Sequence, residues 1–201
     1  MLRGLLALAI PALLVACAGQ PGPPSLTSHE QARAWQAHQA RVAGLGAWAL
    51  SGRISVSTEE DSWSGKLRWR QDGERFQIAF DAPMGMGAAR LRSDDAGVLM
   101  EDANGRQYVA ADAESLLHRF IGMRLPVAGL RHWVTGLPQP HLSSQLEYDG
   151  AGRLARIRQA GWDIRYRGYR HVRNVDLPKK IFIENERLNV RLVIDRWDVQ
   201  A

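Results

Sequence analysis

Residues 48–57 read WALSGRISVS, and this stretch decides the fold class. Trp48, Leu50, Ile54 and Val56 alternate with small or polar residues. An apolar side chain at every second position is typical of an antiparallel β-strand with one buried face and one solvated face. The stretch therefore predicts a mainly β protein.

The segments that follow repeat this alternation. Their apolar positions are Trp63, Leu67, Trp69, Phe76, Ile78 and Phe80. Asp72-Gly73 and Asn104-Gly105 indicate hairpin turns, because glycine accepts the positive φ that such turns need. A late strand is expected to begin at Pro178, where a missing N–H does least harm. The last strand is predicted by an apolar stripe at Leu188, Val190, Leu192 and Ile194.

Three helices are expected among the strands. Residues 27–30 (Thr-Ser-His-Glu) have the capping-box pattern that begins a helix, and Trp35, Gln39 and Val42 form a narrow stripe along that helix. Two shorter helices lie midway along the chain. Their apolar sides carry Leu116, Leu117, Phe120, Leu130, Trp133 and Val134.

These patterns predict a single domain over residues 27–201, built on an antiparallel sheet of about 11 strands. A long sheet with one apolar face must bury that face. One solution is a closed barrel with a filled interior. Another is an open, incompletely closed β-barrel that folds over a cavity and carries an α-helical lid. Composition alone leaves both solutions open.

Stripes rich in tryptophan and phenylalanine make broad, rigid walls that suit a cavity for acyl chains. The candidate cavity residues are the inward apolar positions of the strands and helices. They are Trp48, Leu50, Ile54, Val56, Leu67, Trp69, Phe76, Ile78, Phe80, Leu116, Leu117, Phe120, Leu130, Trp133, Val134, Leu192 and Ile194.

One predicted loop is apolar where turns are usually polar. Residues 82–87 read APMGMG and lie between two predicted strands. An exposed apolar loop indicates contact with a partner that excludes water, and methionine suits irregular contacts with lipid. Pro83, Met84, Gly85 and Met86 therefore form a candidate membrane-insertion loop. The alternative is a loop that folds back and plugs one end of the barrel.

The N-terminus has the layout of a bacterial lipoprotein signal. An apolar run ends in Leu14-Val15-Ala16-Cys17, and Cys17 is the only cysteine. A leucine three residues before the cysteine and a small residue directly before it resemble a lipobox. We expect a signal peptide at 1–16, lipidation at Cys17 and a flexible tether at 17–26. An ordinary signal peptide with a chance cysteine is the alternative, and the run is shorter than the ~20 residues of a spanning helix.

Composition and motifs exclude several classes of function. The chain has a net charge of +5, but export argues against nucleic acid as a partner and favours a solvated face with a modest attraction to anionic lipid. The six histidines lack metal-ligand spacing, so they are expected at the surface. The sequence contains neither a Gly-x-Ser-x-Gly elbow nor a dinucleotide fingerprint. We therefore expect no enzymatic activity, no cofactor and no metal.

The chain resembles the LolB family, the outer-membrane lipoprotein receptors of the lipoprotein-localisation pathway, over about residues 35–197. Short motifs in a fixed order carry the resemblance. They are Ser51-Gly52-Arg53, Leu67-Arg68-Trp69, Ala82-Pro83-Met84-Gly85, Gly122-Met123-Arg124-Leu125-Pro126, Leu130-Arg131-His132-Trp133, Gly136-Leu137-Pro138, Gln159-Ala160-Gly161-Trp162 and Leu177-Pro178. The related periplasmic carrier family, LolA, is soluble and unlipidated, so Cys17 separates the two.

The resemblance implies that the chain accepts triacylated lipoproteins from a LolA-like periplasmic carrier and inserts them into the outer membrane. It implies an open β-barrel with a helical lid, and a lipid anchor in the outer membrane that faces the periplasm. Transfer needs only a monomer, with outer-membrane lipid as the acceptor. The family's loop typically carries leucine where this chain has Met84, which keeps an apolar tip. The alternative function is a structural or assembly lipoprotein that binds protein partners through its sheet edges.

Overall fold

The computed structural model describes residues 26–81, 88–94, 96–121 and 125–200, without the side chains of Phe120 and Ile121. Within these ranges no helix is both long and apolar enough to cross a membrane. The helices are α1 (Ser28–Ala43), α2 (Ala113–Ile121) and α3 (Val127–Trp133). The strands are β1 (Ala47–Ser57), β2 (Ser62–Asp72), β3 (Arg75–Asp81), β4 (Ala88–Asp94), β5 (Gly97–Glu101), β6 (Gln107–Ala110), β7 (Ser144–Tyr148), β8 (Leu154–Gln159), β9 (Trp162–Tyr166), β10 (Tyr169–Val172), β11 (Val175–Pro178), β12 (Lys180–Glu184) and β13 (Asn189–Gln200).

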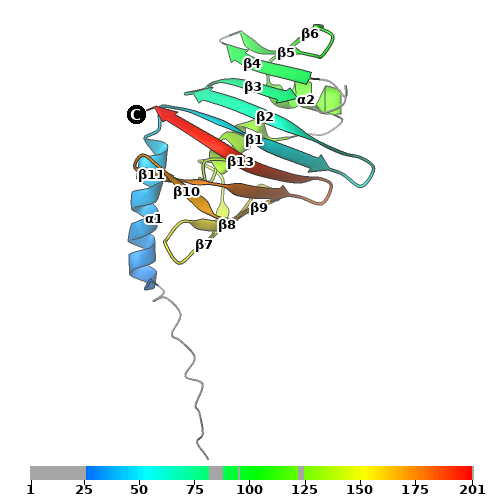
Figure 1. Cartoon of the computed structure of the whole chain (residues 1–201). Helices are drawn as coiled ribbons and strands as arrows, with labels where there is room; N and C mark the ends of the chain where they lie inside the picture. The colour runs from blue at the N-terminus through cyan, green and yellow to red at the C-terminus, as the bar shows by residue number, and fades with distance from the viewer. Residues whose placement is uncertain (1–25, 82–87, 95, 122–124, 201) are drawn as a thin grey trace, which may run out of the picture.

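Eleven strands form one sheet in the order β6-β5-β4-β3-β2-β1-β13-β12-β9-β8-β7, while β10 and β11 form a separate ribbon. The two end strands, β6 and β7, are not paired with each other, so the sheet stays open. Figure 1 shows that α2 lies behind the twisted sheet, and that α1 runs beside β10 and β11. The predicted mainly β fold with an incompletely closed antiparallel sheet is therefore confirmed.

A bulge in β13 keeps the apolar residues of this strand on one face. Gly52 of β1 pairs with Ile194, but the neighbouring Ser51 pairs with Arg196, so Asp195 has no partner in the β1 ladder. The extra residue reverses the alternation. Trp197 and Val199 are therefore buried together with Ile194, although an odd number of positions separates them from it. The last strand runs well beyond the stripe that the sequence predicts.

The inner face of the sheet carries a core that is divided into two clusters. The larger cluster covers β1, β2, β8, β9, β11, β12 and β13 and includes buried residues of α1 and α3. The smaller cluster consists of Leu91, Val98, Met100, Ala113, Leu116 and Val127. Phe76, Ile78 and Leu117 pack against both clusters.

α1 packs against the body through one narrow stripe, formed by Trp35, His38 and Val42. The predicted stripe contained Gln39, which is exposed instead. The His38 and Tyr169 rings lie edge to face with centroids 6.2 Å apart. The expectation that every histidine lies at the surface is therefore wrong for His38, because the i+3 position of this helix faces the body.

Candidate functional site

The inner side of β3 carries apolar side chains that are not fully buried. Phe76, Ile78 and Phe80 alternate along this strand, and each stays partly exposed. Their ladder partners on β2, Gln71, Trp69 and Leu67, are all buried. A partly exposed apolar side chain on the inner side of a sheet leaves contact surface for another apolar group.

Leu117 extends this apolar surface from α2. Asp112 directly precedes the helix, and its carboxylate accepts the Ser115 N–H at 2.7 Å. Leu116 is buried in the smaller cluster, whereas Leu117 is partly exposed and packs against both clusters. Phe76 and Ile78 do the same from β3. We call Phe76, Ile78 and Leu117 the seam, because they lie where the two clusters meet.

Two aromatic rings lie at the end of β3. Trp63 and Phe80 stack edge to face, with ring centroids 4.8 Å apart. A Cβ at Gly65 would lie 2.7 Å from the Phe80 ring, so glycine leaves room for this ring. Phe80 and Asp81 lead into residues 82–87, which lie outside the described residues. Trp63 is absent from the predicted candidates, although its place in the alternation of β2 is a signal for it.

A buried polar network fixes α3 to the sheet. Trp133 Nε1 donates to Gln159 Oε1 at 2.9 Å, and Gln159 Nε2 donates to the Gln139 carbonyl at 2.9 Å. The Tyr166 hydroxyl donates to the Trp133 carbonyl at 2.8 Å. Burial raises the pKa of Tyr166 well above its ordinary value, so the hydroxyl stays a donor. α3 is therefore held to β8 and β9 by hydrogen bonds.

A second contact joins α3 to the turn between β2 and β3. The Arg131 guanidinium forms an ion pair with Glu74, and its Nε donates to His132 Nε2 at 3.2 Å. The hydrogen bond from Arg131 lowers the pKa of Glu74, whereas burial lowers the pKa of His132. The three groups therefore favour a charged carboxylate and a neutral imidazole. In the described part of the chain, no group of His, Cys, Asp or Glu could hold a metal.

The predicted cavity residues fall into three groups. Those buried in the core are Trp48, Leu50, Val56, Leu67, Trp69, Leu116, Trp133, Val134, Leu192 and Ile194. Those partly exposed are Ile54, Phe76, Ile78, Phe80, Leu117 and Leu130. The Phe120 side chain lies outside the described structure, as do the predicted lipidation site, Cys17, and the predicted membrane-insertion loop, Pro83, Met84, Gly85 and Met86. Because the side chains of the partly exposed group reach the surface, they can contact an apolar ligand while the core residues stay in place.

Comparisons with known proteins identify the family. Residues 46–197 match the family model described as outer membrane lipoprotein LolB. The chain is 37% identical to the outer-membrane lipoprotein LolB of Pseudomonas putida KT2440 over 196 residues. This alignment covers 98% of this chain and 96% of the relative. It is 39% identical to the outer-membrane lipoprotein LolB of Nitrosococcus oceani over 181 residues, an alignment that covers 90% of this chain and 88% of that relative.

Solved structures with low sequence identity share the fold. A LolA superfamily protein from Nitrosomonas europaea superposes with a TM-score of 0.52 at 8% identity, over 85% of this chain and 94% of that chain. A DUF1329 family protein from Desulfovibrio piger gives a TM-score of 0.50 at 8% identity, over 85% and 93%. At this identity the likeness concerns the fold alone.

Proposed function

Because the chain belongs to the outer-membrane lipoprotein LolB family, we propose that the inner apolar side of its sheet receives the acyl chains of lipoproteins. The predicted family is confirmed, and the family comprises lipoprotein-trafficking receptors rather than enzymes. The chain is accordingly an outer-membrane receptor that is lipid-anchored and faces the periplasm. Its partners are lipoprotein cargo and a LolA carrier.

The seam is the observation that carries the proposal about the site. Phe76 and Ile78 from the sheet and Leu117 from α2 are apolar, partly exposed and placed between two separately packed clusters. An acyl chain that inserts here separates side chains without breaking either cluster. Each methylene group that it buries contributes about 0.8 kcal/mol. The seam therefore supports the binding of hydrocarbon rather than of a polar ligand.

The size of the hydrophobic effect favours direct transfer. A triacylated lipoprotein carries about forty CH₂ groups, so full exposure of its chains to water costs on the order of 30 kcal/mol. Noncovalent affinities saturate near about −20 kcal/mol. Acyl chains therefore cannot cross water freely. The affinity of one pocket for them also need not equal that of a bilayer. We propose that the chains pass from the carrier to this site and then into lipid, each step being favourable.

The finer parts of this function are also proposals. Lipidation of Cys17 and the tether at 17–26 would hold the body near the bilayer, with the signal peptide at 1–16 removed. The loop of Pro83, Met84, Gly85 and Met86 would enter the outer-membrane lipid at the end of β3. A monomer would suffice, because the seam is formed within one chain. The alternative, an assembly lipoprotein that binds protein through its sheet edges, is not favoured by the family.

A titration with a triacylated lipopeptide tests the proposal. The chain with Cys17→Ala, preloaded with a fluorescent fatty acid, should release it in a saturable, stoichiometric manner. Leu117→Gln should weaken lipopeptide binding roughly tenfold or more, because a polar amide replaces an apolar contact. The conservative variant Leu117→Met should bind the lipopeptide about as tightly as the parent chain. Thermal unfolding of each variant verifies that the fold is kept.

The matched control is His118→Gln, at an exposed position next in sequence on α2. Its affinity for the lipopeptide should equal that of the parent chain. Equal affinity of the Leu117→Gln variant would remove the seam from the binding site. The absence of any saturable binding would contradict the proposed function itself.

A further inference from the structure

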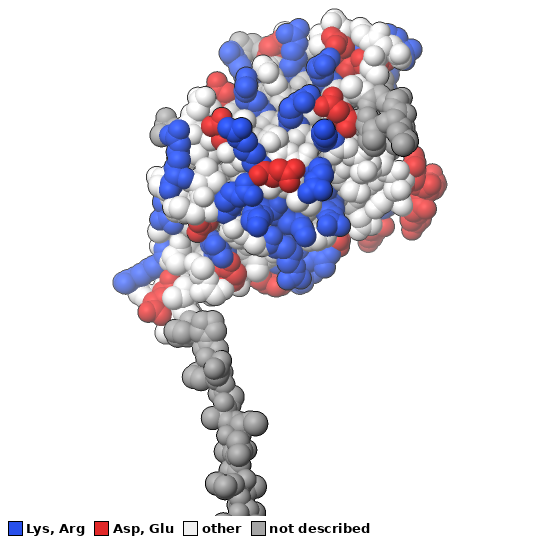
Figure 2. All heavy atoms as spheres, in the orientation of Figure 1, with Lys and Arg blue, Asp and Glu red and all other residues white. Residues whose placement is uncertain are grey.

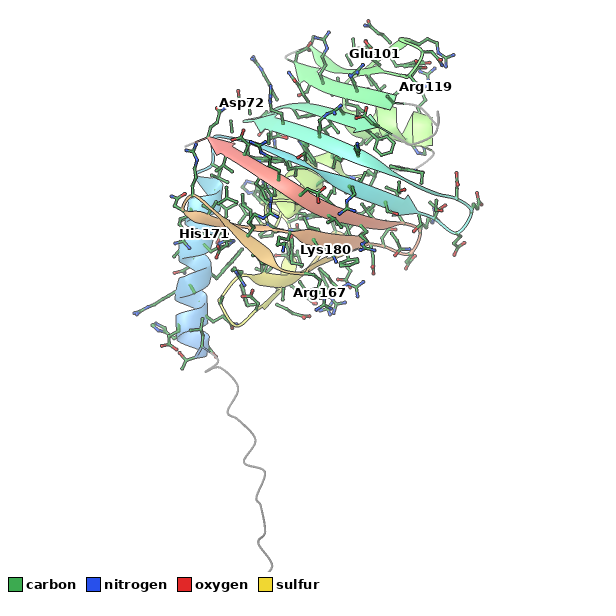
Figure 3. All side chains as sticks on the ribbon, viewed as in Figure 1. Asp72, Glu101, Arg119, Arg167, His171 and Lys180 are labelled. Carbon is green, nitrogen blue, oxygen red and sulfur yellow. The ribbon has the colours of Figure 1, made fainter. Side chains whose placement is uncertain are left out.

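Basic side chains gather on the outward face of the sheet, which is turned toward the viewer in Figure 2. Four of them line a depression of about 750 Å³ across β12, β13, β1 and β2. They are Lys180, Arg191, Arg53 and Lys66, and we call them the basic groove. Lys180 lies near the middle of this face in Figure 3. The groove is on the opposite side of the sheet from the seam.

The register of the strands explains the hollow. Arg53 of β1 pairs with Lys66 of β2, so two long cationic side chains lie side by side. In the next outward row, Ser55 lies between Arg191 of β13 and Ser64 of β2. Short side chains therefore form the floor of the depression, and long basic side chains form its walls.

The positive charge of the groove is poorly compensated. Asp81 lines the groove but is bound by Arg68 at 2.8 Å, and Asp195 forms an ion pair with Arg53 at 3.5 Å. Within the described ranges, Lys66, Lys180 and Arg191 form no ion pair. Lys66 lies opposite Asp81 in the β2–β3 ladder and Arg53 has its own partner in Asp195, so the repulsion between Arg53 and Lys66 is partly offset. The groove still carries more cations than carboxylates, and this excess attracts an external anion.

Another part of the same face shows the usual arrangement. Arg156, Arg158 and Arg165 on β8 and β9 each have a carboxylate partner. These partners are Asp163, Glu147 and Glu184. The arginines are therefore neutralised by the protein itself, whereas three cations of the groove are not. The contrast makes the groove a site for an external anion and provides a control on the same surface.

We propose that the basic groove binds the phosphate groups of anionic membrane lipids. The inference deepens the proposed function and rests on it, since it places the outer membrane against this part of the body. Lys66 pairs with Asp81, the last described residue before the apolar segment 82–87. The groove therefore reaches the end of β3. Clustered basic side chains bind the surface of anionic lipid by electrostatic attraction, at about 1 kcal/mol per side chain.

Sedimentation with vesicles tests the groove. The chain with Cys17→Ala, which keeps every described residue, should bind vesicles of equal parts phosphatidylcholine and phosphatidylglycerol more tightly than vesicles of phosphatidylcholine. The preference should weaken with added salt. The triple variant Lys66→Gln, Lys180→Gln, Arg191→Gln should bind the anionic vesicles roughly 100-fold less tightly, at about fivefold per side chain.

The control variant Arg156→Gln, Arg158→Gln, Arg165→Gln changes the net charge by the same amount. It should lose less than about tenfold in vesicle affinity, because its cations are already paired. Equal losses in the two variants would mean that net charge alone acts, and would overturn the proposal. An absent preference for anionic vesicles would also overturn it. Thermal unfolding of both variants verifies their folding.

A carrier-binding measurement separates the membrane from a protein partner. If the groove variant loses affinity for the LolA carrier but keeps its affinity for anionic vesicles, the groove is a protein-docking surface and the proposal is wrong. Vesicle binding is measured without cargo. A failed lipopeptide titration would therefore contradict the proposed function and leave the vesicle result readable, whereas failed vesicle binding would contradict the groove alone.

Discussion

His38 on α1 is buried, and neither of its ring nitrogens has a hydrogen-bond partner in the described structure. Burial, and next the charge of Arg41, lower the pKa of His38 below its ordinary value of 6.5. The unfolded chain therefore takes up a proton on this imidazole at a higher pH than the folded chain does. Stability should be complete above the unfolded pKa and should fall as the pH drops below it. His132, whose pKa burial also lowers, acts in the same direction.

Substitution of His38 tests this pH dependence. His38→Leu removes an unpaired buried polar group and should leave the free energy of unfolding at neutral pH unchanged or raise it by about 1 kcal/mol. The loss of stability between about pH 8 and about pH 5.5 should shrink. Urea unfolding of the parent chain and the variant at both pH values measures this difference in the free energy of unfolding. A variant with the full pH dependence of the parent would assign the effect to other groups.

At the scale of residues, local contacts are predictable and long-range contacts are not. The capping box is confirmed: the Thr27 side chain accepts the Glu30 N–H, and the Glu30 carboxylate accepts the Thr27 N–H. Both partners lie within four residues, so the sequence contains the whole motif. The burial of His38 depends on Tyr169, which is far away in the chain. No pattern within α1 distinguishes His38 from Gln39 as the buried position.

At the scale of elements, α3 depends on one glutamine of β8. Gln159 accepts from Trp133 Nε1 and from the Gln139 N–H, and it donates to the Gln139 carbonyl. Gln159→Leu leaves these groups without partners and should lower the free energy of unfolding by at least about 2 kcal/mol. Gln145→Leu, at an exposed position of β7, is the control and should change it by less than about 0.5 kcal/mol. Urea unfolding measures both values, and equal losses would show that the network does not hold α3.

The strands divide into those that a pattern predicts and those that need a partner. β1 to β3 follow the predicted alternation, because each has one face toward the core and one toward solvent. Pro178 instead ends β11, where it pairs with Tyr169 in the separate ribbon, and β12 begins at Lys180. That pairing depends on β10 and not on proline chemistry alone. The seam likewise forms only where α2 packs near β3. The sequence patterns predict that its residues are apolar, but they do not predict that these residues lie together.

At the scale of the whole molecule, the open sheet joins two halves of the chain through β1 and β13. β2 to β6 extend to one side of this pair, and β12, β9, β8 and β7 extend to the other. Each half carries part of the apolar inner face, and the strand residues of the smaller cluster, Leu91, Val98 and Met100, all come from β4 and β5. The alternation predicts a sheet but not its strand order, so the division of the core cannot be predicted from the sequence. This division leaves apolar surface available in an otherwise packed protein.

Attachment of this molecule to the membrane should depend on Cys17. A single acyl chain gives only marginal membrane binding, with an association constant of about 10⁴ M⁻¹, and further chains make the anchor stable. Cys17→Ala removes the site of lipidation and should move the protein from the membrane fraction to the soluble periplasmic fraction. Ala18→Ser keeps the cysteine and should leave the protein in the membrane, as fractionation and immunoblotting would reveal. Retention of the Cys17→Ala protein after a high-salt wash would contradict lipidation as the anchor, because salt screens the attraction of the basic groove and leaves only apolar contacts to hold it.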